Sequence, residues 1–275
     1  MPNVRLNFKA NTTIGGLLVT VKRFSDYIKS IEKFRDERDT EFWYRGHSST
    51  SYKLEPFTHR NRTPEDKPKI GIAEQETYDE FVRRSPLFDG QRRDQWDLLF
   101  LMQHYRAPTR LLDWTASPLV ALYFALMTPD KKDPAVVWCF DPAAWNGIVL
   151  SDIKEPPRIF TTDDSLVKQY HPAHKDKTSR NEPLAIQGIM NNPRINAQKG
   201  RFVIFSSEPK PLEVFATDYK VKENGKILGK IEVLPEHKER LLKDLERYGI
   251  TYSTIFPDLE GLALEIRRRF GANHV

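Results

Sequence analysis

Two clusters of residues have the side-chain types and spacing of a binding or catalytic site. The first is the run Trp43, Tyr44, Arg45 and Gly46, in which a guanidinium ends a short aromatic strand and the glycine lets the backbone turn or approach a ligand closely. Arg45 could there clamp a diphosphate. The second is the run at residues 103–118, whose polar and aromatic groups stand between two apolar helices and would be costly to bury unpaired. Together the clusters predict the wall of a pocket.

A structural interpretation of the second cluster stays open beside the functional one. In that interpretation Arg110 and Asp113 form a buried ion pair that tethers two helices, and His104 and Tyr105 cap a helix end. Arg45 taken alone is typical of a surface arginine.

Other site chemistry has weaker support. His171 and His174 stand three residues apart without a third ligand at a recognisable spacing, so we expect surface histidines and no metal. Gly15 and Gly16 lack the Lys and Ser or Thr of a Walker sequence, and no GxGxxG occurs. Cys139 lies in an apolar run, where burial raises the pKa of a thiol and suppresses its reactivity.

Apolar periodicity predicts the elements that must position the two clusters. Ser117 and Pro118 suit the N-cap and first position of an apolar central helix, which places Thr115 and Ser117 at a strand-to-helix corner. We expect C-terminal helices ending near Gly249 and Phe270 to pack on the sheet. The other predicted helices span residues 24–37, 74–84 and 94–105, and the predicted strands span residues 42–45, 110–114, 135–140, 201–206 and 226–234.

Composition describes an ordinary globular chain of 275 residues, 39% hydrophobic and 29% charged. The single cysteine cannot form an intrachain disulfide, which favours a reducing, cytoplasmic setting. Neither a secretion signal nor a clean apolar stretch of about 20 residues is visible, so we expect a soluble protein with no membrane partner. The net charge of +5 favours polyanions such as RNA, but dispersed basic residues are equally typical of a plain surface.

The chain resembles the FRG-domain family along most of its length. The resemblance rests on Tyr44-Arg45-Gly46, on QHYRAPTRLLDWTASPLVALYFA at residues 103–125, on Gln198, Gly200 and Phe202, and on IFPDLEGLA at residues 255–263. Arg106 departs from the pattern, because many members carry glycine there. The resemblance implies a single FRG-type domain over residues 1–275, with a helical lead-in at 1–40 and a long loop-rich segment at 141–200.

The order of these elements is similar to that of NAD-dependent ADP-ribosyltransferases, in which an arginine strand precedes a Ser-Thr-Ser turn and a catalytic glutamate. The implied fold is α+β, an ADP-ribosyltransferase-like split β-sheet core with a helical N-terminal half and C-terminal helices packed on it. Arg45 would hold NAD oxygens, and Thr115 with Ser117 would fix the ribose and support Arg45. Tyr105 or Trp114 would stack on nicotinamide. The implied cofactor-binding set is Tyr44, Arg45, Gly46, His104, Tyr105, Arg110, Trp114, Thr115 and Ser117.

Gln198 stands where the transferase glutamate is expected, and a glutamine orients a hydroxyl but brings no negative charge. Asp113, or Glu232 under a shifted alignment, would supply that charge. The implied catalytic set is therefore Arg45, Asp113, Ser117 and Gln198. The segment at residues 187–197 would meet the acceptor through Asn191, Asn192, Arg194 and Asn196, or it is a solvated loop.

The resemblance implies a cytoplasmic enzyme that transfers ADP-ribose from NAD, as co-substrate and without a metal, to a macromolecule. RNA or another nucleic acid is the first acceptor to test, and the role is that of a toxin or phage-defence effector with an antitoxin or regulatory protein as partner. One alternative is a metal-independent ribonuclease with His104 as acid or base and Arg110 steadying the phosphate. The other is a noncatalytic module that binds a nucleotide or phage protein.

Overall fold

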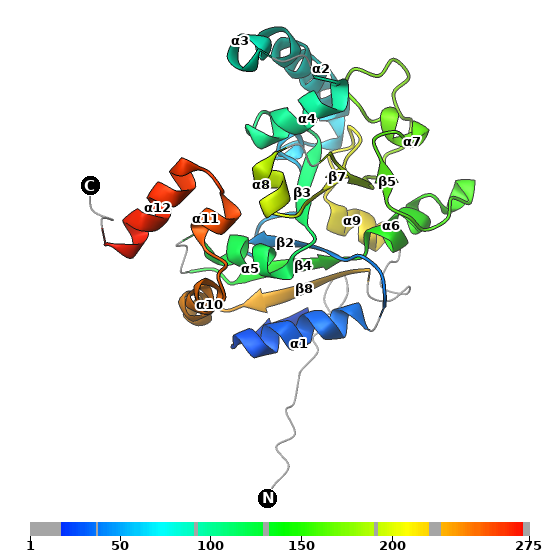
Figure 1. Cartoon of the computed structure of the whole chain (residues 1–275). Coiled ribbons are helices and arrows are strands. Elements are labelled where there is room, and N and C mark those ends of the chain that lie inside the picture. Colours follow the sequence, from blue (N-terminus) through cyan, green and yellow to red (C-terminus); the bar gives the residue numbers. More distant parts are fainter. Residues whose placement is uncertain are drawn as a thin grey trace, which may run out of the picture.

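The computed structural model describes residues 18–36, 38–90, 93–128, 132–189, 192–219 and 227–271. These residues form an α+β fold in which helices surround an open eight-stranded sheet (Figure 1). The strands are β1 (Leu18–Val21), β2 (Trp43–His47), β3 (Leu111–Thr115), β4 (Ala135–Phe140), β5 (Phe160–Thr161), β6 (Leu184–Gln187), β7 (Gly200–Ile204) and β8 (Leu228–Val233). The helices are α1 (Phe24–Arg35), α2 (Lys67–Arg84), α3 (Pro86–Asp89), α4 (Gln95–His104), α5 (Pro118–Leu126), α6 (Pro142–Val149), α7 (Ser165–Lys168), α8 (Pro193–Ala197), α9 (Leu212–Asp218), α10 (Pro235–Arg247), α11 (Tyr252–Ile255) and α12 (Leu259–Arg269). Short 3₁₀ turns stand at η1 (Phe57–His59), η2 (Pro64–Asp66) and η3 (Ser151–Ile153).

The sheet narrows to one residue pair at its centre. The strand order is β1-β8-β4-β2-β3-β7-β6-β5. β2 pairs with β4 from Trp43 to His47, and β3 pairs with β7 from Leu111 to Thr115, but the register between β2 and β3 is the single pair Tyr44 and Thr115. Two half-sheets of four strands therefore meet at what we call the β2–β3 junction.

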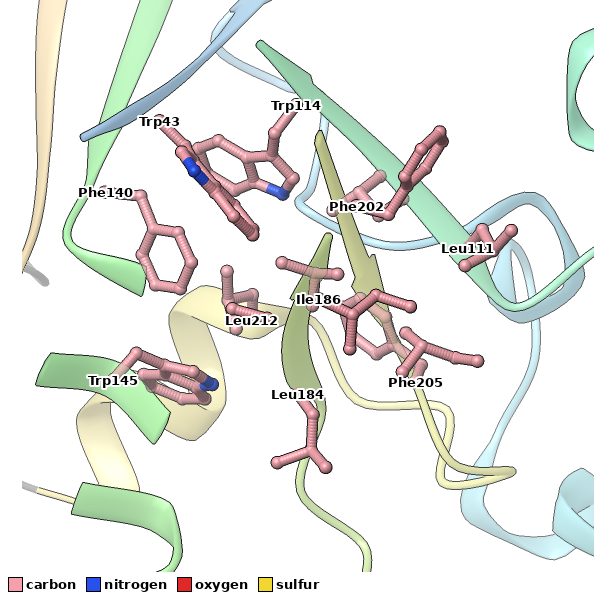
Figure 2. Close-up of a cluster of buried hydrophobic side chains, with 14 of the residues drawn as sticks. Trp43, Leu111, Trp114, Phe140, Trp145, Leu184, Ile186, Phe202, Phe205 and Leu212 are labelled. Carbon is pink, nitrogen blue, oxygen red and sulfur yellow. The ribbon is translucent and has the colours of Figure 1, made fainter. Parts of the chain in front are cut away.

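Each face of the sheet has its own buried hydrophobic cluster, because successive side chains of β2 point to opposite faces. Trp43 joins a cluster with Trp114, Phe140 and Trp145, which converge in Figure 2. Tyr44 joins the other cluster, which contains most of α5 together with residues of α1 and α10. Burial of side chains of this size contributes roughly 2–3 kcal/mol each, so the two clusters fix where β2 lies.

The long periodic elements confirm the sequence predictions. α1, α4, α5 and β4 lie within a few residues of the predicted bounds. Asp94 caps α4 by accepting a hydrogen bond from the Asp97 amide, and Ser117 caps α5 by accepting one from Val120. Cys139 is buried, and burial raises the pKa of its thiol as predicted. The α+β class is confirmed, while the likeness of the core to ADP-ribosyltransferases stays a prediction.

Two segments predicted to contain no strands do contain them, so both predictions are wrong. The lead-in at residues 1–40 contains β1, which pairs in parallel with β8, and the first half of the chain supplies β1, β2, β3 and the start of β4. The segment at 141–200 holds β5, β6 and three short helices. Elements of two to five residues are too short to show a period. β6 is fixed instead by buried Asn146, whose side chain donates to the Ala185 carbonyl and accepts from its amide, both at 2.9 Å.

The prediction that both C-terminal helices pack on the sheet holds for α10 only. Leu241 and Leu245 of α10 are fully buried beside α5. On α12, by contrast, Leu259 is 84% and Phe270 74% exposed, and Figure 1 shows the helix projecting from the body. α12 contacts α11 through Gly261, whose missing side chain lets it lie against the Phe256 carbonyl. None of the helices in the described ranges is long and apolar enough to cross a membrane.

Gly46 is required for the close approach of α5 to β2. A methyl group at this position would lie 1.9 Å from the backbone oxygen of Ala121. We expect Gly46→Ala to lower the free energy of unfolding by about 3 kcal/mol or more, since backbone must move. Urea unfolding followed by circular dichroism measures this change.

Gly249→Ala is the matched control. Gly249 has a φ of +81° with no atom within 4 Å of an added methyl, so only backbone strain is introduced. Its cost should be about 1 kcal/mol. Equal losses in the two variants would contradict a packing role for Gly46.

Candidate functional site

A cleft of about 870 Å³ opens at the β2–β3 junction, and we call it the junction cleft. It is lined by the predicted site residues Tyr44, Arg45, Gly46, Asp113, Trp114, Thr115 and Gln198. Its volume lies within the range typical of small-molecule sites. Thus residues 44–46 and 113–115, which are distant in sequence, and Gln198 beyond them share one concave surface.

Arg45 is fixed across the gap between the two half-sheets. Its Nε donates to His47 Nε2 at 3.0 Å, and its Nη1 donates to the backbone carbonyl of Asp113. Burial and the neighbouring Arg45 charge lower the pKa of His47 to about 3, so this imidazole is neutral and accepts from Arg45. Among the described residues no acceptor contacts Arg45 Nη2, which leaves that amino group for a ligand.

The carboxyl group of Asp113 lies beside Arg45 and is held from the other side by Gln103. Gln103 Nε2 donates to Asp113 Oδ2 at 2.7 Å, and Gln103 Oε1 accepts from the Thr109 hydroxyl. Asp113 is exposed to the open cleft. Partial loss of hydration between the cleft walls raises its pKa, while the Arg45 charge and the Gln103 hydrogen bond act in the opposite direction. This carboxylate is therefore oriented and more basic than an ordinary surface aspartate.

Thr115 and Ser117 hold the turn between β3 and α5. The Thr115 hydroxyl donates to the Gln198 carbonyl at 2.6 Å and accepts from the Ser117 amide at 3.0 Å. The Ser117 hydroxyl caps α5, and Ser117 does not line the cleft. The predicted support of Arg45 by these two residues is wrong, because His47 and the Asp113 carbonyl provide it.

A side pocket of about 150 Å³ adjoins the junction cleft and shares Asp113, Trp114, Arg194 and Gln198 with it. His104 lies in this side pocket. Desolvation, followed by the positive charge of Arg194, lowers the pKa of His104, so its imidazole is neutral at pH 7. His104 is thus near Asp113 but on the far side of the shared wall.

Neither predicted nicotinamide-stacking residue presents its ring to the cleft. Tyr105 is 68% exposed and lines a different groove, with Phe81 and Phe88. Trp114 is 3% exposed, and its ring packs on Phe140 with centroids 5.0 Å apart. The accessible aromatic residue of the cleft is Tyr52, which is 54% exposed.

Sequence reasoning missed the basic side of the cleft. Lys53, Arg60 and Arg62 line it together with Arg194 and Arg45, against the carboxylates Glu55 and Asp113. The signal was the run of His59, Arg60, Asn61 and Arg62, which follows no helix or strand period. Five cationic side chains in one cleft favour an anionic ligand.

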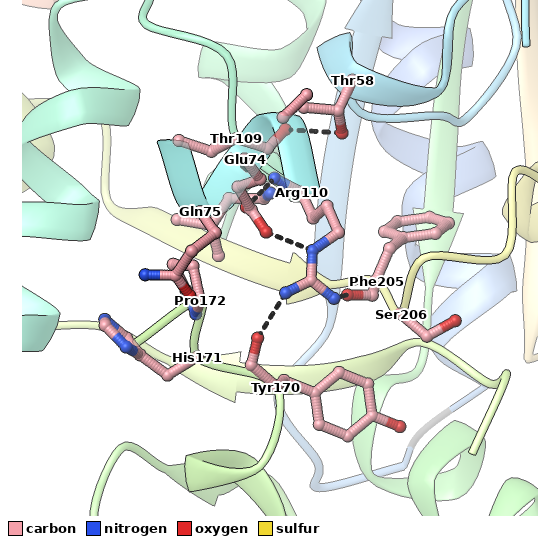
Figure 3. Close-up of polar contacts among 12 residues, drawn as sticks. Thr58, Glu74, Gln75, Thr109, Arg110, Tyr170, His171, Pro172, Phe205 and Ser206 are labelled. Atoms are coloured by element: carbon pink, nitrogen blue, oxygen red, sulfur yellow. Dashed lines mark hydrogen bonds and ion pairs between the residues drawn. The ribbon is translucent and has the colours of Figure 1, made fainter. Parts of the chain in front are cut away.

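Arg110 lies elsewhere. It is buried, and it pairs with Glu74 of α2 through Nε, so the ion pair with Asp113 considered from the sequence is wrong (Figure 3). Its Nη1 donates to the Phe205 carbonyl at 3.1 Å and its Nη2 to the Tyr170 carbonyl at 2.6 Å. It lines a separate pocket that shares no residue with the junction cleft, and we leave it out of the candidate site.

Of the remaining candidate residues, some line the junction cleft and others lie away from it. Glu232 is absent from the cleft lining and pairs with Lys230 at 3.1 Å, so of the two carboxylates only Asp113 is in place. In the acceptor segment, Asn192 caps α8 and Arg194 reaches the cleft, whereas Asn191 lies outside the described residues. No group of three or more potential metal ligands occurs among the described residues.

Comparison with known proteins gives one family match. Residues 40–134 match the FRG domain. The FRG segment contains the Tyr44-Arg45-Gly46 run and the block at residues 103–125, so both clusters of the sequence analysis fall within it. Gln198, Gly200, Phe202 and residues 255–263 lie beyond it, and a single FRG-type domain over the whole chain stays a prediction. No curated protein and no solved structure matched the chain.

Arg106 stands where many FRG-domain members carry glycine, and its backbone conformation should lower the stability of the protein. Arg106 adopts a φ of +61°, a left-handed conformation that glycine accepts without strain. Arg106→Gly should raise the free energy of unfolding by about 0.5–1 kcal/mol. The control Arg83→Gly, inside helix α2, should lower it by about 1 kcal/mol. Chemical unfolding that shows a loss for Arg106→Gly as well would contradict this strain.

Three buried histidines make the stability depend on pH. His47 and His59 have pKa values of about 3 and His171 of about 4, each lowered first by burial. His171 is therefore not the surface residue expected from the sequence. An unfolded histidine titrates near pH 6.5, so unfolding takes up protons below that pH, and stability present above it is lost as the pH falls.

We expect the free energy of unfolding to fall by about 4 kcal/mol between pH 7.5 and 5.5, the sum for three histidines. Urea midpoints at the two pH values measure the change, and His171→Gln should reduce the fall by about a third. Unfolding that takes up no protons in this interval would show that the histidines are not buried neutral.

Proposed function

We propose that the junction cleft binds NAD and transfers its ADP-ribose group to a macromolecule. The observation that carries the proposal is the presence in one cleft of the fixed Arg45, the oriented carboxylate of Asp113 and Gln198. Their order along the chain, with the Thr115 to Ser117 turn between them, is the order expected from the resemblance to ADP-ribosyltransferases.

The cationic side of the cleft supports binding of a dinucleotide diphosphate. Arg45 is held rigidly by two hydrogen bonds and retains Nη2 for phosphate oxygens. Arg60 and Arg62 line the same cleft and add charge without being fixed in the same way. Guanidinium groups suit this ligand, since their N–H groups bond two phosphate oxygens at once.

Asp113 is the group proposed to act at the reacting carbon. When the bond between C1′ of the ribose and nicotinamide breaks, the electron pair leaves with nicotinamide and positive charge develops on the ribose. An ionised Asp113 stabilises that charge. The acceptor then bonds to C1′ and gives up a proton, for which the raised pKa of Asp113 makes it a suitable base.

Gln198 is proposed to orient the ribose. Its Nε2 donates to the Ile255 carbonyl at 3.2 Å, which fixes the side chain and leaves Oε1 to accept from a ribose hydroxyl. In this proposal Gln198, in the turn between α8 and β7, positions the ribose, and Asp113 on β3 supplies the negative charge.

The ribonuclease alternative is less well supported. It requires His104 and Arg110 to act on one phosphate, but they line different pockets, and Arg110 is occupied by Glu74. RNA remains the first acceptor to test, because the chain has a net charge of +5 and Lys53, Arg60 and Arg62 place positive charge at the cleft. A toxin or phage-defence role, with an antitoxin or regulatory protein as partner, is part of the same proposal.

Incubation of the purified protein with NAD labelled in the adenylate phosphate, together with cellular RNA and protein, tests the proposal. We expect label on an acceptor and release of nicotinamide. Arg45→Ala and Asp113→Asn should each reduce the rate by at least about 100-fold, the scale for losing one charge-stabilising group. Glu232→Gln, a matched loss of a strand carboxylate outside the cleft, should leave it unchanged.

Three outcomes would overturn the proposal: wild-type protein that neither cleaves NAD nor labels an acceptor, an Asp113→Asn variant as active as wild type, or an inactive Glu232→Gln variant. NAD binding without turnover would identify a noncatalytic module.

A further inference from the structure

A second pocket, of about 550 Å³, is lined by Arg110 from the polar run at residues 103–118, and we call it the Arg110 pocket. It is bounded by α2, by the segment at residues 169–181 and by Ser206 and Ser207. It shares no lining residue with the junction cleft. Figure 3 shows Arg110 at the centre of its polar contacts, with Gln75 and Pro172 nearby.

The charges of this pocket are mostly positive. Lys67, Arg110, Lys177 and Arg180 line it, against the single carboxylate Glu76. Three of the four cations pair with a carboxylate that does not line the pocket: Glu208 at 3.3 Å for Lys67, Glu74 for Arg110 and Asp152 at 2.6 Å for Arg180.

Lys177 differs from the other three. The oxygens that its Nζ contacts within the described residues are neutral: Gln75 Oε1 at 3.2 Å, the His171 carbonyl at 3.3 Å and the Pro172 carbonyl. These three acceptors use the three N–H donors of the ammonium group, but none of them carries a negative charge. An anion at this point would replace one of the neutral acceptors and supply the missing negative charge.

The neighbouring titratable groups report the same positive field. The pKa values of Lys177, His171 and His59 are all lowered, first by burial and then in part by the charge of Arg110. At Lys177 the carboxylates of Glu74 and Asp79 act in the opposite direction. Because both histidines are neutral at pH 7, the repulsion between like charges that a bound anion would relieve is the one between Lys177 and Arg110.

The rest of the wall offers neutral donors and space. Thr178, Ser179 and Ser207 bring hydroxyl groups, and Pro68, Ile72 and Pro172 bring apolar surface. Ser207 Oγ lies 3.1 Å from the position that a side chain on Gly71 would take, so glycine keeps that wall open. Each Nη of Arg110 carries a second N–H besides the one bound to a carbonyl.

We propose that the Arg110 pocket binds a phosphate-bearing small molecule, with the phosphate between Lys177 Nζ and the Arg110 guanidinium. A phosphate group has several strong acceptor oxygens for these donors, and the volume suits a ligand of mononucleotide size. The proposal does not depend on NAD chemistry, because it rests on residues outside the junction cleft.

Calorimetric titration of the full-length chain with inorganic phosphate and with AMP, at constant ionic strength set by chloride, tests this site. We expect saturable binding of at least one probe, weakened about tenfold or more in Lys177→Gln and in Lys67→Gln. Lys175→Gln is the matched control, since it removes the same charge from the same segment but outside the pocket. The titrations are repeated in an Arg45→Ala background, which removes an anion contact from the junction cleft, so binding that remains is assigned to the Arg110 pocket.

Binding of phosphate alone would assign the site to the free ion, and binding of AMP alone to a nucleotide. The proposal is overturned if neither probe saturates, if Lys177→Gln binds as tightly as Lys175→Gln, or if Arg45→Ala abolishes binding, which would place the anion in the junction cleft.

Discussion

The arrangement of the molecule depends on the single backbone pair that joins the two half-sheets, Tyr44 with Thr115. Beyond that pair β2 and β3 no longer bond to each other, and the backbone groups left at the gap need other partners. Arg45 meets part of that need by donating to the Asp113 carbonyl. The same divergence opens the junction cleft, so the feature that weakens the sheet also creates its concave surface.

Packing behind the junction keeps this geometry in place. Gly46 lets α5 lie directly against β2, and the Ser117 cap starts α5 immediately after β3 ends. Trp43 and Tyr44 anchor β2 in clusters on opposite faces. Arg45 therefore emerges from a strand fixed on both sides, which is the rigidity that a charge-stabilising group requires.

Sequence periodicity predicted α1, which has a regular apolar face, and α5, which is apolar on most sides, and residue types predicted the cap at Ser117. It failed where the determining contact is distant. Arg110 finds Glu74, which stands 36 residues earlier, and β6 is fixed by Asn146, 39 residues before it. The apolar residues of α12 recur at helical spacing, which by itself predicts a buried face. The helix packs instead through Gly261.

The same distinction applies to the candidate site. Arg45 and Asp113 were found because their side chains are unusual in their local setting, and Gln198 because of the family resemblance. The structure brings the three into one cleft. Lys53, Arg60 and Arg62 come from an irregular segment, where a basic residue is ordinarily a surface residue, and only tertiary structure places them. The polar run at residues 103–118, which looked like one site, supplies Asp113 to the cleft, with Gln103 holding its carboxyl group, and Arg110 to a second pocket.

The central claim is that Arg45 and Asp113 hold the two reacting parts of one NAD molecule, and a crystal structure of Asp113→Asn soaked with NAD tests it most directly. The account predicts the diphosphate within hydrogen-bond distance of Arg45 and the nicotinamide ribose beside residue 113. NAD bound outside the junction cleft, or a cleft that stays empty at saturating NAD, would contradict it.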